Sequence, residues 1–505
     1  MDIVFLTALY WTGSFLSRAG YDLISGLIVI CAAGGLYVYY CRRSGMLLDP
    51  QGLFSLAFIG GAGVSLLKLS MLQKAWSAKT FLCIYLAWLG FAAGSRAAGY
   101  LQSRSADRVR KSWRSGNEAG PQTAGQDGAY AGTLTVRNAG KPGLCRGADG
   151  PAVREPLPGR TFACRREIFL LIAALTLVSY AAFAVEALLL GYIPLFTVDT
   201  PHAYSYFHIS GLHYFTVLCV LVPSLMVVYA YSLGSTEKEH RTEAWAALLF
   251  TAAAAVLPLL LVSRFQLIFA FALAGMSLLL IEGKHLKVYI KPMTIAAAAA
   301  AFALLVILYV FLSFERAHSV EYLNGIFEMK NSRMPIWITQ PYIYIANNYD
   351  NLNCLIEELG SFAHGLRMLF PVIALSGLKF IRPELCAFPL YITKEELTTL
   401  TIVYDAYYDF GLPGVAAFTF VMGIVMGIVK VWMCRAVNTE NVKSESYVNP
   451  VIYIAAAQLS FYMLFSFFTT WFSNPATWFY LGVTVIMYLF VWYRMRRQKR
   501  TASVI

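Results

Sequence analysis

The stretch AWAALLFTAAAAVLPLLLVSRFQLIFAFALAGMSLLLI, residues 244–281, decides the fold class of this chain, because its 38 residues hold a single formal charge, Arg264. As one helix it would be about 57 Å long, nearly twice the ~30 Å hydrocarbon thickness of a bilayer. We therefore expect two membrane spans joined by a very short turn at residues 263–266, with Pro258 bending the first span. Arg264 then lies at or just below one membrane face, where it either snorkels to water or has a partner.

The composition of the whole chain supports this interpretation. Hydrophobic residues make up 58% and charged residues 13%, which excludes the soluble globular class. The long apolar runs are continuous, whereas the strands of outer-membrane barrels alternate apolar and polar residues. We predict an all-α polytopic membrane protein with about 12 transmembrane helices, or about 11 if residues 3–18 do not span. The predicted spans are residues 3–18, 21–41, 51–70, 79–97, 168–191, 213–233, 244–262, 265–281, 292–313, 411–432, 449–471 and 475–493.

The basic connections between these spans predict the orientation of the chain. Alternation of the spans places every basic connection on one side, which is therefore cytoplasmic, together with both termini. The net charge of +12 is thus an orientation signal and does not indicate a nucleic-acid partner. The predicted parts are N-terminal transmembrane helices (1–97), a disordered basic cytoplasmic loop rich in Gly, Ser, Pro and Arg (98–167), central transmembrane helices (168–313), a large external loop (314–410), C-terminal transmembrane helices (411–493) and a basic cytoplasmic tail (494–505).

The external loop 314–410 is the segment where function is most expected. Loops longer than about 15 residues are usually functional or disordered, and this one is rich in aromatic residues, unlike a disordered linker. We expect it to pack against the membrane face as amphipathic helices.

Arginines on the external side contradict the orientation bias that holds elsewhere in the chain. A guanidinium group presents a planar fork of donors suited to phosphate, so an anionic lipid headgroup is the simplest ligand, although each arginine singly can be a surface ion pair. These external arginines are Arg264, Arg316, Arg333, Arg367 and Arg382.

The motif YDAYYDFGLPG, residues 404–414, stands directly before the next predicted span. If its first residues are helical, Asp405 and Asp409 lie one turn apart on one face, with Tyr404 and Tyr408 stacked beside them. Neighbouring carboxylates can supply a general base, and tyrosines bind sugar rings. The alternative is an interfacial aromatic belt with capping aspartates.

Three weaker patterns complete the candidates. Residues 342–360, YIYIANNYDNLNCLIEELG, hold a polar cluster amid tyrosines such as Tyr342, and this cluster either hydrogen-bonds a glycan or caps a helix; its members are Asn347, Asn348, Asp350, Asn351 and Asn353. The small-xxx-small spacing GIVMG at residues 423–427 predicts close helix packing. Cys354 and Cys386 are both external and could form a disulfide, and no cysteine or histidine pattern indicates a metal site or a cofactor.

Taken in order, five patches of the chain resemble the Wzy-type oligosaccharide repeat-unit polymerases, the family that extends bacterial O-antigen, capsule and related polysaccharides. The resemblance implies a GT-C-like membrane glycosyltransferase in the bacterial cytoplasmic (inner) membrane that works without a metal. The patches are MLLDPQGLFSLAF with WSAKTFLCIYLAWLGFAAGS (46–58 and 76–95), GYIPLF (191–196), VSRFQLIF (262–269), PYIYIANNYDNLN (341–353) and YYDFGLPGVAAFTFVMG (407–423). The long insert 98–167 departs from a typical member.

The resemblance also implies the partners and the residue roles. A polyprenyl-diphosphate-linked oligosaccharide is both donor and acceptor, membrane lipid surrounds the site, and a chain-length regulator protein is a further partner. Arg264 would hold the donor diphosphate, a second arginine among Arg316, Arg333 and Arg367 would assist it, and the base is left open between His364, Asp405 and Asp409. The competing functions are the related O-antigen ligase, a lipid-linked oligosaccharide flippase or other transporter, and a non-catalytic scaffold.

Overall fold

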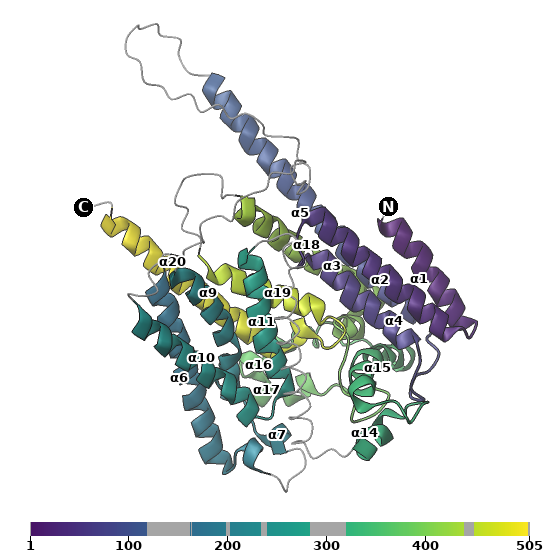
Figure 1. Cartoon of the computed structure of the whole chain (residues 1–505). Coiled ribbons are helices and arrows are strands. Elements are labelled where there is room, and N and C mark those ends of the chain that lie inside the picture. The colour runs from purple at the N-terminus through teal and green to yellow at the C-terminus, as the bar shows by residue number, and fades with distance from the viewer. Residues whose placement is uncertain are drawn as a thin grey trace.

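The computed structural model describes residues 2–118, 162, 164–197, 203–233, 240–282, 320–438 and 449–502. Within these ranges the chain is all-α, and its only β-type pairing is an isolated bridge between Ser70 and Met329. Eight of the described helices are long and apolar enough to cross a membrane. The fold is therefore that of an all-α polytopic membrane protein, as the composition predicts (Figure 1).

The long helices carry most of the described chain. They are α2 (Asp22–Ser44), α5 (Ala78–Glu118), α6 (Arg165–Leu190), α9 (Val222–Leu233) with the short α8 (His213–Thr216) before it, α10 (Arg241–Leu260), α11 (Arg264–Glu282), α18 (Tyr404–Asn438) and α20 (Pro475–Ala502). Shorter helical stretches pack among them, namely α1 (Asp2–Arg18), α3 (Pro50–Phe54), α4 (Gly60–Leu66) and α19 (Val451–Leu464). The predicted span 292–313 lies outside the described residues.

The apolar stretch 244–281 forms two antiparallel helices, α10 and α11, as its length predicts. The turn between them is even shorter than expected, because α11 already begins at Arg264. The backbone reverses at Val262, whose φ of 52° is left-handed, and the Ser263 N–H donates to the carbonyl of Pro258 at 2.9 Å.

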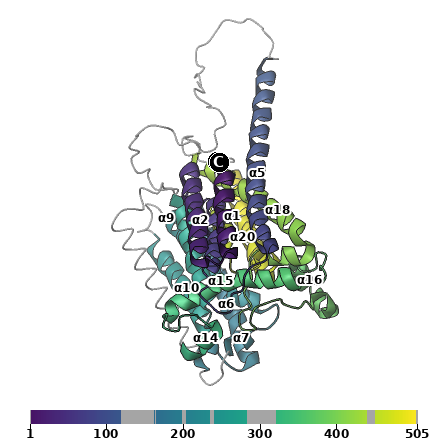
Figure 2. The same ribbon diagram turned by 90° about the vertical axis from the view of Figure 1, so that its right-hand side faces the viewer.

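Both termini lie at one end of the bundle, and the far part of α5 extends beyond that same end (Figures 1 and 2). α5 stays helical to Glu118, so the predicted disordered loop 98–167 is wrong over its first residues, and residues 119–161 lie outside the description. The opposite end, called the distal end below, carries α7 (Ala203–Tyr206), α14 (Val320–Phe327), α15 (Ile336–Glu358), α16 (Phe370–Leu375) and α17 (Leu378–Ile381).

Glycines let α5 and α18 touch backbone to backbone. A Cβ added at Gly423 would lie 2.2 Å from the Phe91 carbonyl oxygen, and one added at Gly94 would lie 2.0 Å from the Phe420 carbonyl oxygen. Because no side chain fits at these positions, the helices approach as closely as two backbones can. The close packing predicted from Gly423 and Gly427 is confirmed, with Gly90 and Gly94 completing it on α5.

The sequence predicts amphipathic surface helices in the external loop, and only part of the described segment 320–410 has this character. α15 is largely buried, and it is fastened to the connection between α4 and α5 by side-chain hydrogen bonds. The short helices α16 and α17 instead expose apolar side chains. They are the part of this segment that matches the expected amphipathic surface.

Candidate functional site

The first turns of α18 are separated from its membrane-spanning part by a break at Gly411. Gly411 has φ 63° and ψ −149°, a backbone conformation that is essentially restricted to glycine. A Cβ there would also lie 3.0 Å from the ring of Phe362. Residues 404–410 consequently form a short helix of their own, and this helix carries the acidic and aromatic residues of the motif.

Asp409 holds the backbone of the loop 363–368. Its carboxylate accepts the N–H groups of Arg367 at 3.2 Å and Met368 at 2.8 Å, and its carbonyl accepts the N–H of His364 at 3.2 Å. Left-handed torsions at His364 (φ 50°) and Gly365 (φ 99°) curl the loop so that the N–H groups of Arg367 and Met368 converge on one carboxylate. The fully buried Asp409 therefore positions Arg367.

Asp405, one turn earlier on the same face, holds the side chain of Arg367. The guanidinium Nε donates to Asp405 Oδ1 at 2.5 Å, and both side chains are largely buried. Three aromatic rings surround the guanidinium carbon, Tyr408 at 4.9 Å, Phe388 at 5.6 Å and Tyr404 at 5.7 Å from their centroids. Cation–π attraction and the ion pair together fix this arginine in one orientation.

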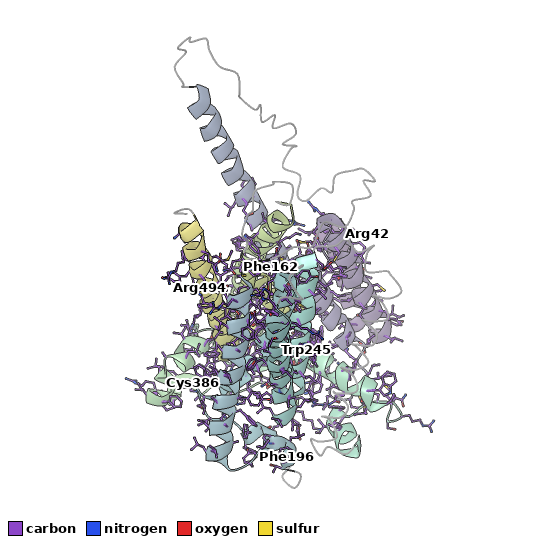
Figure 3. All side chains as sticks on the ribbon, turned by 60° about the vertical axis from the view of Figure 1, so that its left-hand side comes forward. Arg42, Phe162, Phe196, Trp245, Cys386 and Arg494 are labelled. Atoms are coloured by element: carbon purple, nitrogen blue, oxygen red, sulfur yellow. The ribbon has the colours of Figure 1, made fainter. Side chains whose placement is uncertain are left out.

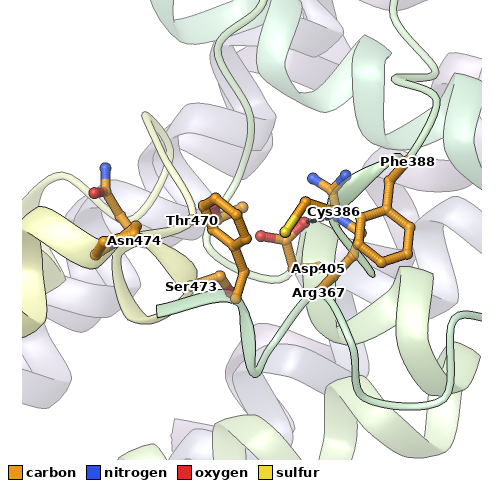
Figure 4. A pocket seen from close by; sticks show the side chains of 9 residues that line it. Arg367, Cys386, Phe388, Asp405, Thr470, Ser473 and Asn474 are labelled. Atoms are coloured by element: carbon orange, nitrogen blue, oxygen red, sulfur yellow. Dashed lines mark hydrogen bonds and ion pairs between the residues drawn. The ribbon is translucent and has the colours of Figure 1, made fainter. Parts of the chain in front are cut away.

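The guanidinium borders a cavity of about 330 Å³ at the distal end (Figure 4). Within the described chain, the terminal nitrogens of Arg367 make no hydrogen bond, and neither does the second carboxylate oxygen of Asp405. These groups are therefore available to a ligand. The cavity is lined by Arg367, Phe370, Cys386, Phe388, Asp405, Thr470, Ser473, Asn474 and Pro475.

The wall opposite Arg367 is the start of α20. The Asn474 side chain accepts the N–H of Ala476, as expected of an N-cap residue, and Pro475 occupies the first helical position. The amino end of a helix carries partial positive charge. An arginine and the positive end of a helix dipole thus line one cavity, which favours an anionic ligand there.

Several predicted site residues are not brought to this cavity. Arg264 is buried at the start of α11, while its neighbour Phe265 stacks on Phe468. The side chains of Arg333 and His364 are exposed and do not line the cavity. Arg316 lies outside the described residues.

The predicted polar cluster on α15 has structural partners. Asn347 bonds to the Thr393 hydroxyl, Asn348 donates to the Phe467 carbonyl at 2.7 Å, and the Tyr342 hydroxyl donates to Gln73 at 2.5 Å. All three side chains are buried. The prediction that they bind a glycan is therefore not supported, and these bonds join α15 to other segments of the chain and do not cap a helix, the alternative that the sequence left open.

Asp350 on α15 is the most unusual acid of this region. Its carboxylate accepts hydrogen bonds from Trp76 at 2.8 Å, Gln73 at 3.0 Å and Ser65 at 3.2 Å. Burial raises the pKa of Asp350 to about 7, against the lowering effect of these bonds. Asp350 does not line the cavity, and it joins α15 to the connection between α4 and α5.

Sequence reasoning identified Asp405, Asp409, Tyr404, Tyr408 and Arg367, which the structure brings together. It missed the wall formed by Thr470, Ser473 and Asn474. The signal was present in TTWFSNPA, residues 469–476, a polar break with a proline between two apolar spans.

Neither a disulfide nor a metal cluster is found in the described part of the chain. Cys354 and Cys386 are both free thiols, so the suggested bond between them is absent. No group of three or more His, Cys, Asp or Glu side chains is arranged there to hold a metal ion.

No protein-family model matches this chain, and neither a curated protein nor a solved structure matches it.

Proposed function

We propose that this protein is a membrane glycosyltransferase that polymerises polyprenyl-diphosphate-linked oligosaccharide repeat units into a bacterial surface polysaccharide at the outer face of the cytoplasmic membrane. The observation that carries the proposal is the Arg367–Asp405 pair in an aromatic-walled cavity at the distal end. The sequence resemblance supplies the reaction class, and the cavity offers the two functions that this reaction needs.

The first function is stabilisation of the leaving diphosphate. When the anomeric C–O bond of the donor breaks, its electron pair and negative charge remain on the polyprenyl diphosphate. Arg367 borders the space where that charge would develop, and its terminal nitrogens are the donors for it, while the start of α20 lines the same space and adds the positive end of its dipole. Fixed donors in a site of low dielectric stabilise such charge strongly, because they need no reorganisation during the reaction.

The second function is removal of the acceptor proton. In the proposed step the acceptor hydroxyl oxygen forms the new bond to the anomeric carbon, and its proton passes to Asp405. Asp405 lines the cavity and uses only one carboxylate oxygen for Arg367, so the other can accept this proton. Asp409 is assigned to positioning, because its carboxylate is used by backbone N–H groups.

This assignment moves the donor site from Arg264 to Arg367. The segment that follows α19 lies between these two arginines. Phe265, next to Arg264, packs on Trp471, and Thr470, next to Trp471, lines the cavity. A role for Arg264 itself stays a prediction.

The test is a polymer-length gel of a knockout strain complemented with variants. Arg367→Ala and Asp405→Asn are each expected to reduce long chains by about 100-fold or more, the usual effect of losing one donor or base at such a site. Arg43→Ala removes an exposed arginine of α2 as a matched control and should leave the polymer unchanged. Membrane levels of each variant are compared by immunoblot.

The pattern of the remaining glycan separates the competing functions. A single repeat unit still attached to the lipid core supports a polymerase, whereas an undecorated core supports a ligase or flippase. Persistence of long chains in both cavity variants, at wild-type protein levels, would overturn the proposed site.

A further inference from the structure

The segment 369–382, which comprises α16, α17 and their connection, exposes many large apolar side chains. Six of its side chains, from Leu369 to Ile381, are exposed, and a contiguous apolar patch on a folded protein usually marks an interaction site. Their exposed fractions are Leu369 54%, Val372 65%, Leu375 45%, Leu378 36%, Phe380 68% and Ile381 74%.

The position of this segment indicates what covers it. α16 packs against α20 and against residues 471–473, so it lies level with the point where a membrane-spanning helix begins. Figure 2 shows α16 projecting sideways from the bundle, and Figure 3 shows Cys386, just beyond α17, at its lateral edge. A lateral projection at that level meets the boundary between lipid headgroups and acyl chains.

The charges of the segment fit the same boundary. Lys379 lies 4.8 Å above the ring of Phe380. Arg382 follows α17 directly, with its side chain 66% exposed and in an exposed ion pair of 3.4 Å with Glu384. Apolar side chains bordered by basic ones are the pattern of interfacial helices, which bury one face among acyl chains and present cations to phosphates.

We propose that the segment 369–382 is a monotopic anchor inserted into the bilayer leaflet at the distal end, with its apolar side chains among the acyl chains and Lys379 and Arg382 among the phosphates. Its occupant is therefore lipid. A second copy of the chain or a soluble protein would bury the apolar side chains equally well, but neither explains their location at the end of a span.

The anchor also borders the candidate site. Phe370, near the start of the segment, and Cys386, shortly after its end, both line the cavity of Arg367. Insertion of the anchor holds this edge of the cavity at headgroup depth, so a membrane-borne anion can reach Arg367 sideways. This consequence rests on the proposed function, whereas the insertion itself does not.

Photo-cross-linking of the full-length protein in nanodiscs of phosphatidylethanolamine and phosphatidylglycerol tests the insertion. p-Benzoylphenylalanine is placed at Phe380, at Leu489 on the exposed face of α20 as a lipid control, and at the exposed Ser332 as a water control. Lipid adducts are measured by intact-protein mass spectrometry after irradiation.

We expect the lipid-adduct yield at Phe380 to lie within about threefold of the yield at Leu489. The yield at Ser332 should be at least about tenfold below that at Leu489, because the reagent reacts only with C–H bonds in contact with it. A yield at Phe380 equal to that at Ser332, or covalent dimers of the chain in place of lipid adducts, would overturn the anchor. The Leu489 control reports correct insertion of each preparation. Lipid adducts at Phe380 together with unaltered polymer in Arg367→Ala would reject the proposed function and keep the anchor.

Discussion

Replacement of Asp409 by alanine should release the loop that carries Arg367. The carboxylate accepts two backbone N–H groups, and hydrogen bonds to a charged group are each worth about 1.5–3 kcal/mol. Losing both should lower the free energy of local opening by about 3–6 kcal/mol. At the lower limit, the amides of Arg367 and Met368 would exchange about 150-fold faster, since each 1.4 kcal/mol is a factor of ten.

Hydrogen–deuterium exchange with mass spectrometry, on a peptide that covers residues 363–369, measures this change in the detergent-solubilised protein. Asp405→Ala is the matched control, because Asp405 bonds only the side chain of Arg367 and should leave both amides protected to within about threefold. Equal protection of the peptide in Asp409→Ala and wild type would show that the carboxylate does not hold the loop.

Two further substitutions test the fold around the site. Gly94→Ala should destabilise the protein by about 3 kcal/mol or more, because its Cβ meets the backbone of α18. Gly99→Ala is the control and should be neutral or slightly stabilising, because nothing lies within 4 Å of its Cβ. Both are measured by thermal unfolding, and similar melting temperatures of the two variants would contradict the close crossing of α5 and α18. In the folded protein Asp350 keeps its proton up to about pH 7, whereas in the unfolded chain it loses the proton near pH 4. The free energy of unfolding should therefore fall by about 4 kcal/mol as the pH rises from about 4 through 7. In Asp350→Asn this part of the pH dependence should disappear, and an unchanged pH profile would refute it.

Much of the fold follows from sequence because the bilayer constrains it so strongly. Length and apolar composition predicted that 244–281 forms two helices, since backbone groups in lipid must be paired within the helix. Helical spacing predicted that Asp405 and Asp409 share a face. Both inferences depend only on residues near one another in the chain.

The rest of the site depends on tertiary contacts that spacing does not encode. The partner of Asp405 is Arg367, which reaches it only because left-handed residues curl the loop, and nothing in the local sequence distinguishes it from Arg333. The asparagines of α15 have the composition of a glycan site, yet their donors are used by backbone carbonyls of other segments. The extent of α5 was missed because its sequence beyond residue 97 is polar and basic, the composition expected of a disordered loop.

The break at Gly411 gives the short helix 404–410 a direction of its own, separate from that of the membrane-spanning part of α18. Beyond it, α18 packs closely against α5 through glycines, and tilting of membrane-spanning helices is one response to a change in bilayer thickness. Such tilting can be absorbed by torsion at a single residue, while the short helix 404–410 stays tied to the loop that it grips. The grip of Asp405 and Asp409 on the loop 363–368 thereby depends less on the tilt of the membrane-spanning part of α18.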